Sequence, residues 1–256
     1  MSQRLDVEVS FRGLCDSREK AKILISEGKV SVNGKIITKP SFKTEECDRV
    51  EIVGEVMPYV SRGGLKLEKA VKVFGIDLKG KTAIDMGAST GGFSDVMLQN
   101  GVSKIYAVDV GTGQLAEKIK NNPAVINMEN TNIRNMVFED IGEKVDFISI
   151  DTSFISLKLI LPTAFNFIKN DGEIVALIKP QFEAGKSNIG KNGIVKDKKI
   201  HKSVINDIYS FVIQNSFVPV NLTVSPISGG DGNIEYLMHI KSTGIPFDVC
   251  FIERGI

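Results

Sequence analysis

From Lys81 onward the chain alternates short apolar runs with amphipathic stretches, and this alternation constrains its fold more than any other feature. We expect strands at residues 82–86, 104–110, 124–128, 145–150, 173–179, 218–224 and 235–240, and helices at 65–74, 92–100, 114–121, 155–168 and 198–214. Such alternation is typical of βαβ units, whose strands form a parallel sheet. A loop at 228–232 joins the last two strands without a helix, so these strands should pair antiparallel at one edge. The pattern predicts an α/β fold with a seven-stranded, mostly parallel sheet and a final antiparallel strand.

The turn after the first expected strand is rich in glycine and reads DMGASTGG at residues 85–92. Dinucleotide-binding folds place GxGxxG here, because glycines let a pyrophosphate approach the backbone. In this chain Asp85 precedes the glycines. A carboxylate there would repel pyrophosphate but can pair with the ammonium of a methionine group. With the closing antiparallel strand, the turn favours a Rossmann-fold methyltransferase with S-adenosylmethionine as cofactor over a dehydrogenase.

We expect the cofactor to contact this turn and the strand ends beside it. The candidate cofactor-binding residues are Asp85, Gly87, Ala88, Ser89, Gly91, Gly92, Phe93, Asp109, Val110, Asn132 and Asp151. Asp109 ends the second expected strand, where a carboxylate can accept hydrogen bonds from ribose hydroxyls. Asn132 follows the third expected strand, near the expected position of the adenine.

Two lysines and two carboxylates from distant segments form the candidate catalytic site. Lys66 begins a helix after a Gly-Gly pair, Asp151 and Lys179 end the fourth and fifth strands, and Glu235 begins the last. Ligands of open α/β sheets bind at the carboxyl ends of the parallel strands, and an antiparallel strand begins at that same edge. Taken singly, these residues could be a solvated lysine, a helix cap or a surface acid. Their joint placement predicts an active site.

Methyl transfer to a hydroxyl group is a reaction that such a set of residues can support. A ribose 2′-hydroxyl is a poor nucleophile and must lose its proton as it attacks a sulfonium methyl group. A lysine has an ordinary pKa of about 10.4, so it needs burial or a second cation to act as a base near neutrality. We expect Lys179 to be the base or hydroxyl-orienting group, with Lys66, Asp151 and Glu235 as its electrostatic frame.

The amino-terminal residues predict a small α+β module. Residues 17–28 have a Ser17 cap, an apolar helical face and a terminal Gly28. A hairpin should follow, because Asn33 and Gly34 separate two short apolar strands. Although the whole chain has a net charge of only +1, residues 11–43 hold eight Lys/Arg against three acids. A second basic stretch, 179–202, has seven lysines against two acids. Such clusters can be solvated surface or can contact phosphates.

Residues 3–54 resemble the S-four-type RNA-binding domain, in the spacing of Arg4-Leu5-Asp6, of the SREKA motif at 17–21 and of the GKVSVNGK motif at 28–35. The resemblance implies docking on structured RNA through its backbone and shape. The candidate RNA-binding residues are Arg4, Arg18, Lys20, Lys22, Lys29, Asn33, Lys35 and Arg62.

The Lys-Asp-Lys-Glu order and the turn at 85–93 resemble the FtsJ-like ribose 2′-O-methyltransferases. The chain is similar to the TlyA (hemolysin A) family, because these features follow an RNA-binding module. The similarity extends to the motifs YVSRGGLKL at 59–67, VDVGTGQL at 108–115 and IKPQFE at 178–183. This resemblance implies methylation of cytidine 2′-hydroxyls in ribosomal RNA or ribosomal subunits. We expect an RNA-binding domain at 1–54, a linker at 55–60, a methyltransferase domain at 61–244 and a tail at 245–256.

Composition narrows the alternatives. Cys15, Cys47 and Cys250 form no CxxC pair and histidines number only two, so we expect no disulfide framework and no metal site. The sequence has no apolar run of about 18 residues and no signal peptide, which favours a cytoplasmic protein without a membrane partner. Two alternatives stay open: a non-catalytic RNA-binding or ribosome-assembly factor, and a membrane-lytic hemolysin. The sequence does not indicate an oligomeric state.

Overall fold

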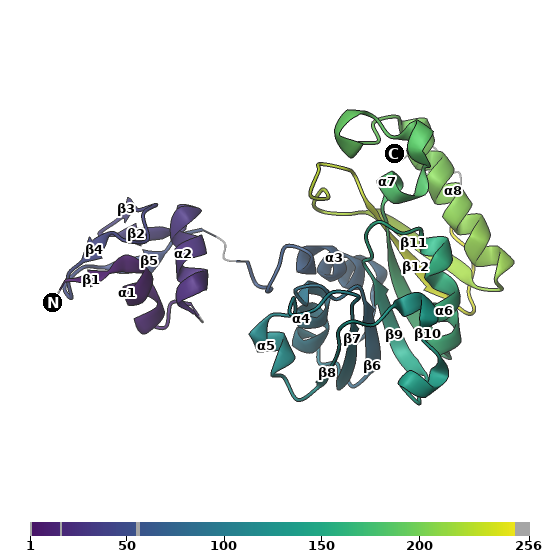
Figure 1. Cartoon of the computed structure of the whole chain (residues 1–256), viewed down its shortest axis with the longest axis horizontal. Coiled ribbons are helices and arrows are strands. Elements are labelled where there is room, and N and C mark those ends of the chain that lie inside the picture. The colour runs from purple at the N-terminus through teal and green to yellow at the C-terminus, as the bar shows by residue number, and fades with distance from the viewer. Residues whose placement is uncertain (1, 16, 55–56, 249–256) are drawn as a thin grey trace. The chain divides into compact units, whose positions relative to one another are not determined.

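The computed structural model describes residues 2–15, 17–54 and 57–248. The chain divides into two compact units, Met1–Pro58 and Tyr59–Ile256 (Figure 1). Tyr59 is buried in the hydrophobic core of the second unit. Residues 55 and 56 of the expected linker, and 249–256 of the expected tail, lie outside the described residues. The domain boundaries expected from the sequence therefore stay a proposal at the level of single residues.

The first unit is a small α+β structure. Its elements are β1 (Gln3–Arg4), α1 (Leu5–Phe11), α2 (Arg18–Ser26), β2 (Val30–Val32), β3 (Lys35–Ile36), β4 (Lys43–Thr44) and β5 (Val50–Ile52). Strand β2 lies between β3 and β5, and β1 pairs with β4. The buried side chains of α1, α2, β2 and β5 form one hydrophobic core. Ser17 accepts a hydrogen bond from the backbone of Lys20, so it caps α2 as the sequence predicts.

Helix α1 was not expected from the sequence. Residues 5–9 alternate apolar and acidic side chains, as an exposed strand would. In the structure Asp6 and Glu8 are buried, and arginines satisfy both: Arg4 and Arg18 bind Asp6, and Arg12 binds Glu8. These ion pairs allow the acidic side chains to be buried in a helix that the local alternation does not indicate.

The second unit contains a seven-stranded sheet, as predicted. Its strands are β6 (Thr82–Met86), β7 (Lys104–Val108), β8 (Val125–Met128), β9 (Val145–Ile150), β10 (Ile168–Ile178), β11 (Val218–Val224) and β12 (Tyr236–Lys241). They lie in the order β11-β12-β10-β9-β6-β7-β8. Within this sheet β12 runs antiparallel to both of its neighbours, and the pairings among β6 to β10 are parallel. The predicted α/β class and final antiparallel strand are confirmed.

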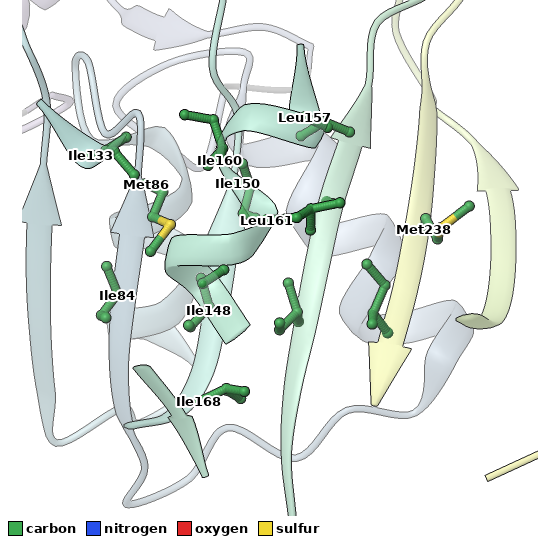
Figure 2. Close-up of a cluster of buried hydrophobic side chains, with 14 of the residues drawn as sticks. Ile84, Met86, Ile133, Ile148, Ile150, Leu157, Ile160, Leu161, Ile168 and Met238 are labelled. Carbon is green, nitrogen blue, oxygen red and sulfur yellow. The ribbon is translucent and has the colours of Figure 1, made fainter. Parts of the chain in front are cut away.

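Helices cover both faces of this sheet (Figure 1). On one face lie α3 (Gly64–Phe74), α4 (Gly92–Gln99) and α5 (Glu117–Lys120), whose apolar side chains share a core with Ala83, Ile105 and Phe147. On the other lie α6 (Leu161–Phe167) and α8 (Lys198–Gln214). Figure 2 shows this second core, in which Leu161 packs over strand residues including Ile148. Because side chains alternate along each strand, the one sheet supports both cores.

For two helices the predicted bounds were wrong. Residues 155–168 form a 3-10 helix, Leu157–Leu159, then α6, and Ile168 already belongs to β10. Pro162 in the first turn of α6 lacks the N–H that a continuous helix would need. Helix α5 has four residues instead of the expected eight, because Glu129 accepts a hydrogen bond from the Gln114 backbone and holds that segment in a loop.

Short elements complete the second unit. Helix α7 (Pro180–Glu183) follows β10, and further 3-10 helices span Ile133–Asn135, Phe138–Asp140, Lys186–Asn188 and Lys191–Gly193. Among the described residues, no helix combines the length and apolar character that crossing a bilayer requires.

Candidate active site

The four predicted catalytic residues meet at the carboxyl edge of the parallel strands. Asp151 directly follows β9, Lys179 follows β10, Glu235 precedes the antiparallel β12, and Lys66 lies in the first turn of α3. All four line one cavity of about 290 Å³. The sequence-based expectation that strand order would bring them together is therefore met by the geometry.

Asp151 links the two lysines. Its Oδ1 lies 2.6 Å from Lys179 Nζ, and its Oδ2 lies 3.8 Å from Lys66 Nζ. Lys66 Nζ also donates to Glu235 Oε2 at 2.6 Å. The result is a chain of alternating charges in the order Lys179, Asp151, Lys66, Glu235.

These charges are largely withdrawn from water. The side chain of Glu235 is 2% exposed and those of Lys66 and Lys179 are 10% and 9% exposed. Isolated buried charges are costly, so each must have an opposite partner. Two lysines and two carboxylates give the cluster no net formal charge, which makes its burial tolerable.

Ser153 and Gln181 contact the charged cluster directly. Lys179 Nζ donates to Ser153 Oγ at 2.8 Å. Gln181 Nε2 lies 3.4 Å from Glu235 Oε1, at the long end of hydrogen bonding. Both side chains line the cavity. The sequence analysis missed them, although Ser153 stands two residues after Asp151 and Gln181 two residues after Lys179.

The glycine-rich turn forms one wall of the cavity. Five of the candidate cofactor-binding residues line it: Gly87, Ala88, Ser89, Gly92 and Phe93. Gly87 has φ +91°, and a Cβ placed on it would lie 2.5 Å from the Asp151 carbonyl oxygen. A Cβ on Gly92 would collide with Ser61 Oγ. These two positions require glycine because the turn packs directly against the segments that carry Asp151 and Lys66.

Asp85 lies beneath the turn and is fully buried. Its Oδ2 accepts a hydrogen bond from Ser94 Oγ at 2.7 Å, and its Oδ1 accepts one from Ser149 Oγ at 3.0 Å. Burial raises the pKa of Asp85 to about 6, although both serine hydroxyls oppose the shift. Asp85 is outside the set of cavity-lining residues, so its predicted contact with the cofactor stays a prediction.

Asp109, Val110, Gly91 and Asn132 are also outside the cavity lining. The carboxylate of Asp109 accepts hydrogen bonds from the backbone of Ser89 at 2.8 Å and of Gly111 at 2.7 Å, which ties the glycine-rich turn to the loop after β7. Val110 is 71% exposed beside it. Asn132 caps the 3-10 helix that follows β8 by accepting from the Arg134 backbone.

Two aromatic side chains missed by the sequence analysis stand at the cavity. Phe154 is 90% exposed and has φ +63°, a backbone conformation that is rare for non-glycine residues. Its ring centroid lies 5.0 Å from that of Phe182, and both residues line the cavity. The adjacent glycine loop supplies Gly229, Gly230 and Asp231. An apolar, exposed aromatic beside a charged cavity provides a surface on which a planar ligand can stack.

The candidate RNA-binding side chains of the first unit differ in their surroundings. Lys35 is exposed on the hairpin. Arg4 and Arg18 are partly exposed but are paired with the buried Asp6. Asn33 has φ +51° in the hairpin turn, and its side chain bonds Asp48 and the Arg49 backbone. The hairpin turn therefore already accounts for an asparagine at position 33, and its contact with RNA stays a prediction.

Lys22, Lys29, Lys20 and Arg62 are the remaining candidates for RNA binding. Lys22 pairs with Glu19 at 2.6 Å and Lys29 with Glu27 at 2.8 Å. Lys20 donates its backbone N–H to the capping Ser17. Arg62 is exposed in the second unit, two residues before α3. These ion pairs are on the surface and so cost little to exchange for phosphate contacts.

The fold and the site together define a Rossmann-fold methyltransferase. The sheet is mostly parallel with one antiparallel strand, and the glycine-rich turn lies beside the cavity that holds the Lys-Asp-Lys-Glu residues. The FtsJ-like methyltransferase family matches residues 59–242, and the S4 domain matches residues 3–50. The chain belongs to the FtsJ-like methyltransferase family and carries an amino-terminal S4 domain.

Two curated relatives and a solved structure resemble the chain over nearly its whole length. The 16S/23S rRNA (cytidine-2′-O)-methyltransferase TlyA of Mycobacterium tuberculosis is 38% identical, over 93% of this chain and 90% of that protein. A presumed rRNA methyltransferase of Bacillus subtilis, YqxC, is 46% identical over 94% and 86%. The solved structure of a presumed hemolysin from Streptococcus thermophilus has a TM-score of 0.77 and 44% identity, covering 99% of this chain and 94% of that one.

Proposed function

We propose that this protein transfers a methyl group from S-adenosylmethionine to the 2′-hydroxyl of a cytidine in ribosomal RNA. The observation that carries the proposal is the buried chain of Lys179, Asp151, Lys66 and Glu235, which lines one cavity with the glycine-rich turn. Cytidine and ribosomal RNA are inferred from the name of the TlyA relative. A cytoplasmic site of action follows from that substrate.

The turn and its neighbours fit a methionine-nucleoside cofactor. Gly87 and Gly92 allow close backbone approach at the cavity wall, because a side chain at either position would meet a neighbouring segment. The exposed apolar Val110 adjoins Asp109, which suits an adenine ring beside a ribose. Asp85 would act from beneath, by fixing the turn through Ser94 and Ser149. S-adenosylmethionine, when bound, supplies an electrophilic methyl group.

Lys179 is the residue best placed to handle the proton. Its Nζ is buried, lines the cavity and is held by Asp151 and Ser153. The cofactor would supply the methyl group, to which the 2′-oxygen would bond as the carbon–sulfur bond breaks and its electron pair goes to sulfur. Lys179, once one of its ammonium protons has passed to solvent, would accept the hydroxyl proton at Nζ. Lys66 and Glu235 keep Asp151 in position and balance the local charge.

The S4 domain and the aromatic pair provide the contacts expected for RNA. A basic surface on the first unit would bind phosphates without reading sequence. At the cavity, Phe154 offers an exposed ring on which an unpaired base could stack. These features favour an unstacked nucleotide as the acceptor.

The test is incubation of the purified protein with labelled S-adenosylmethionine and ribosomal subunits that lack the modification. We expect label in ribosomal RNA, at a cytidine that resists alkaline cleavage because its 2′-hydroxyl is methylated. Tight cofactor binding without transfer to either subunit would instead support a non-catalytic RNA-binding or assembly factor. Leakage of dye from liposomes that persists in a Lys179→Ala variant would support the lytic alternative.

A further inference from the structure

The loops that follow β9 and β10 lie side by side and are joined at several points. At the far end, Glu183 accepts hydrogen bonds from Ser156 Oγ at 2.6 Å and from the Leu157 backbone at 2.7 Å. In the middle, the rings of Phe154 and Phe182 are in contact. Near the cavity, Lys179, the proposed base, makes an ion pair with Asp151 and donates a hydrogen bond to Ser153.

The backbone around Ser153 is held in an unusual conformation. The next residue, Phe154, has φ +63°, a backbone conformation that is unfavourable for a residue with a Cβ. Such a turn persists only where neighbouring contacts fix it. Here the hydrogen bond from Ser156 to Glu183 and the contact between the Phe154 and Phe182 rings supply those contacts. The turn places the Ser153 side chain in the cavity.

The geometry at Lys179 Nζ gives Ser153 a specific task. A tetrahedral amine nitrogen has three positions besides its carbon. Asp151 Oδ1 at 2.6 Å and Ser153 Oγ at 2.8 Å occupy two of them. Among residues 2–15, 17–54 and 57–248, the structure records no third hydrogen-bond partner for this nitrogen, and the Phe182 ring centroid is 5.9 Å away.

We propose that Ser153 is a positioning residue for methyl transfer, which turns the free direction of Lys179 Nζ toward the ribose hydroxyl. This proposal rests on the proposed function. A neutral lysine amine has two N–H bonds and one lone pair. When Asp151 and Ser153 accept the two N–H bonds, the lone pair takes the third direction. Without Ser153 the amine rotates, and the lone pair spends less time facing the acceptor proton.

The main experiment compares Ser153→Ala and Ser153→Thr with the unaltered protein in steady-state transfer to ribosomal subunits. We expect Ser153→Ala to lower kcat about 10- to 100-fold, because misplaced reacting groups cost this much. The KM values for S-adenosylmethionine and RNA should change less than twofold. Ser153→Thr keeps the hydroxyl and should recover at least half of kcat. An unchanged kcat in Ser153→Ala, a rise in the KM for RNA alone, or a Thr variant as slow as Ala would each overturn the proposal.

A second measurement does not depend on activity. With ¹⁵N-labelled lysine, the exchange of Lys179 Nζ hydrogens with water can be followed by NMR and assigned with Lys179→Met. We expect exchange at least threefold faster in Ser153→Ala than in the unaltered protein, and unchanged in Ser203→Ala, which alters an exposed serine on α8. Equal exchange rates in Ser153→Ala and the unaltered protein would overturn the role of Ser153. An unaltered protein that fails to methylate RNA but shows this exchange difference would refute the proposed function and leave the hydrogen-bond geometry intact.

Discussion

Lys66 donates a 2.6 Å hydrogen bond to Glu235, although 169 residues separate them in the sequence. Both side chains are buried, and Asp151 is the next charge along the cluster, at 3.8 Å from Lys66. Burial of a single member of such a pair would be costly, so the two residues depend on each other. The pair also joins α3, which carries Lys66, to the strand that closes the sheet.

Removing one member of this pair should therefore destabilise the protein more than removing both. We expect Lys66→Met to lower the free energy of unfolding by about 3 kcal/mol, since Glu235 would be left buried without its cation. The double variant Lys66→Met/Glu235→Gln should recover most of that loss but stay inactive. Chemical denaturation measures the free energy of unfolding of the single and the double variant. The exposed Lys72→Met on the same helix is the control. Equal losses in the single and double variants would contradict this dependence.

Lys179→Met should abolish methyl transfer while S-adenosylmethionine still binds. The side chain handles the acceptor proton in the proposed mechanism, so we expect kcat to fall at least about 100-fold. Calorimetry should give a cofactor Kd within about threefold of the unaltered protein, as should the Lys72→Met control. A fully active Lys179→Met protein would refute the assignment of the base.

Asp85 should make the protein less stable as pH rises. Its folded pKa is about 6, above the ordinary value of 3.8, so the folded state holds its proton more tightly than the unfolded state. Stability that is present below about pH 4 is then lost as pH rises to 6, by about 3 kcal/mol. We expect Asp85→Asn to match the unaltered protein at pH 4 and to exceed its unfolding free energy at pH 7. Asp171→Asn, at an exposed site, should show no such divergence; a constant difference for Asp85→Asn across this range would count against the prediction.

Gly87→Ala tests the close approach of the glycine-rich turn to Asp151. An alanine there combines an unfavourable φ of +91° with a Cβ 2.5 Å from the Asp151 carbonyl oxygen. Gly80→Ala is the matched control, because φ is +73° but an added Cβ meets no described atom within 4 Å. We expect Gly80→Ala to cost about 1 kcal/mol and to leave cofactor affinity unchanged. Gly87→Ala should cost about 3 kcal/mol and weaken cofactor binding at least tenfold, as measured by denaturation and calorimetry. Equal losses of stability and of cofactor affinity in Gly87→Ala and Gly80→Ala would show that the close approach of Gly87 to Asp151 is unimportant.

Lys35→Glu should weaken RNA binding without affecting the fold. Lys35 is exposed on the hairpin, so charge reversal should change stability by no more than about 0.5 kcal/mol and lower the salt dependence of RNA binding.

Arg18 is a poorer probe of RNA binding than the sequence indicated. It pairs with the buried Asp6, whose pKa is raised by burial but lowered overall by the hydrogen bonds from Arg4 and Arg18. Arg18→Gln should therefore destabilise the first unit. Filter binding and thermal unfolding separate the two effects, and unchanged RNA affinity in Lys35→Glu would remove this lysine from the RNA-binding surface.

The sequence alone determined the sheet, the glycine-rich turn and the positions of Lys66, Asp151, Lys179 and Glu235. These features follow from local periodicity and from the rule that ligand-binding residues gather at the carboxyl ends of parallel strands. The short α5 and the break at Ile160 do not follow from apolar spacing, because a hydrogen bond from the Gln114 backbone to Glu129 and the proline in the first turn of α6 override that spacing.

Only the tertiary structure decided which charged residues face the cavity and which support it from behind. In the sequence Asp85 resembles a ligand-contacting acid, yet the fold buries it between Ser94 and Ser149. Ser153 has no distinguishing pattern, yet the paired loops bring it to Lys179. The physical reason is that strand periodicity fixes which edge of the sheet a residue reaches. Burial and hydrogen-bond partners depend on segments far away in the chain, and these are fixed only when the chain has packed.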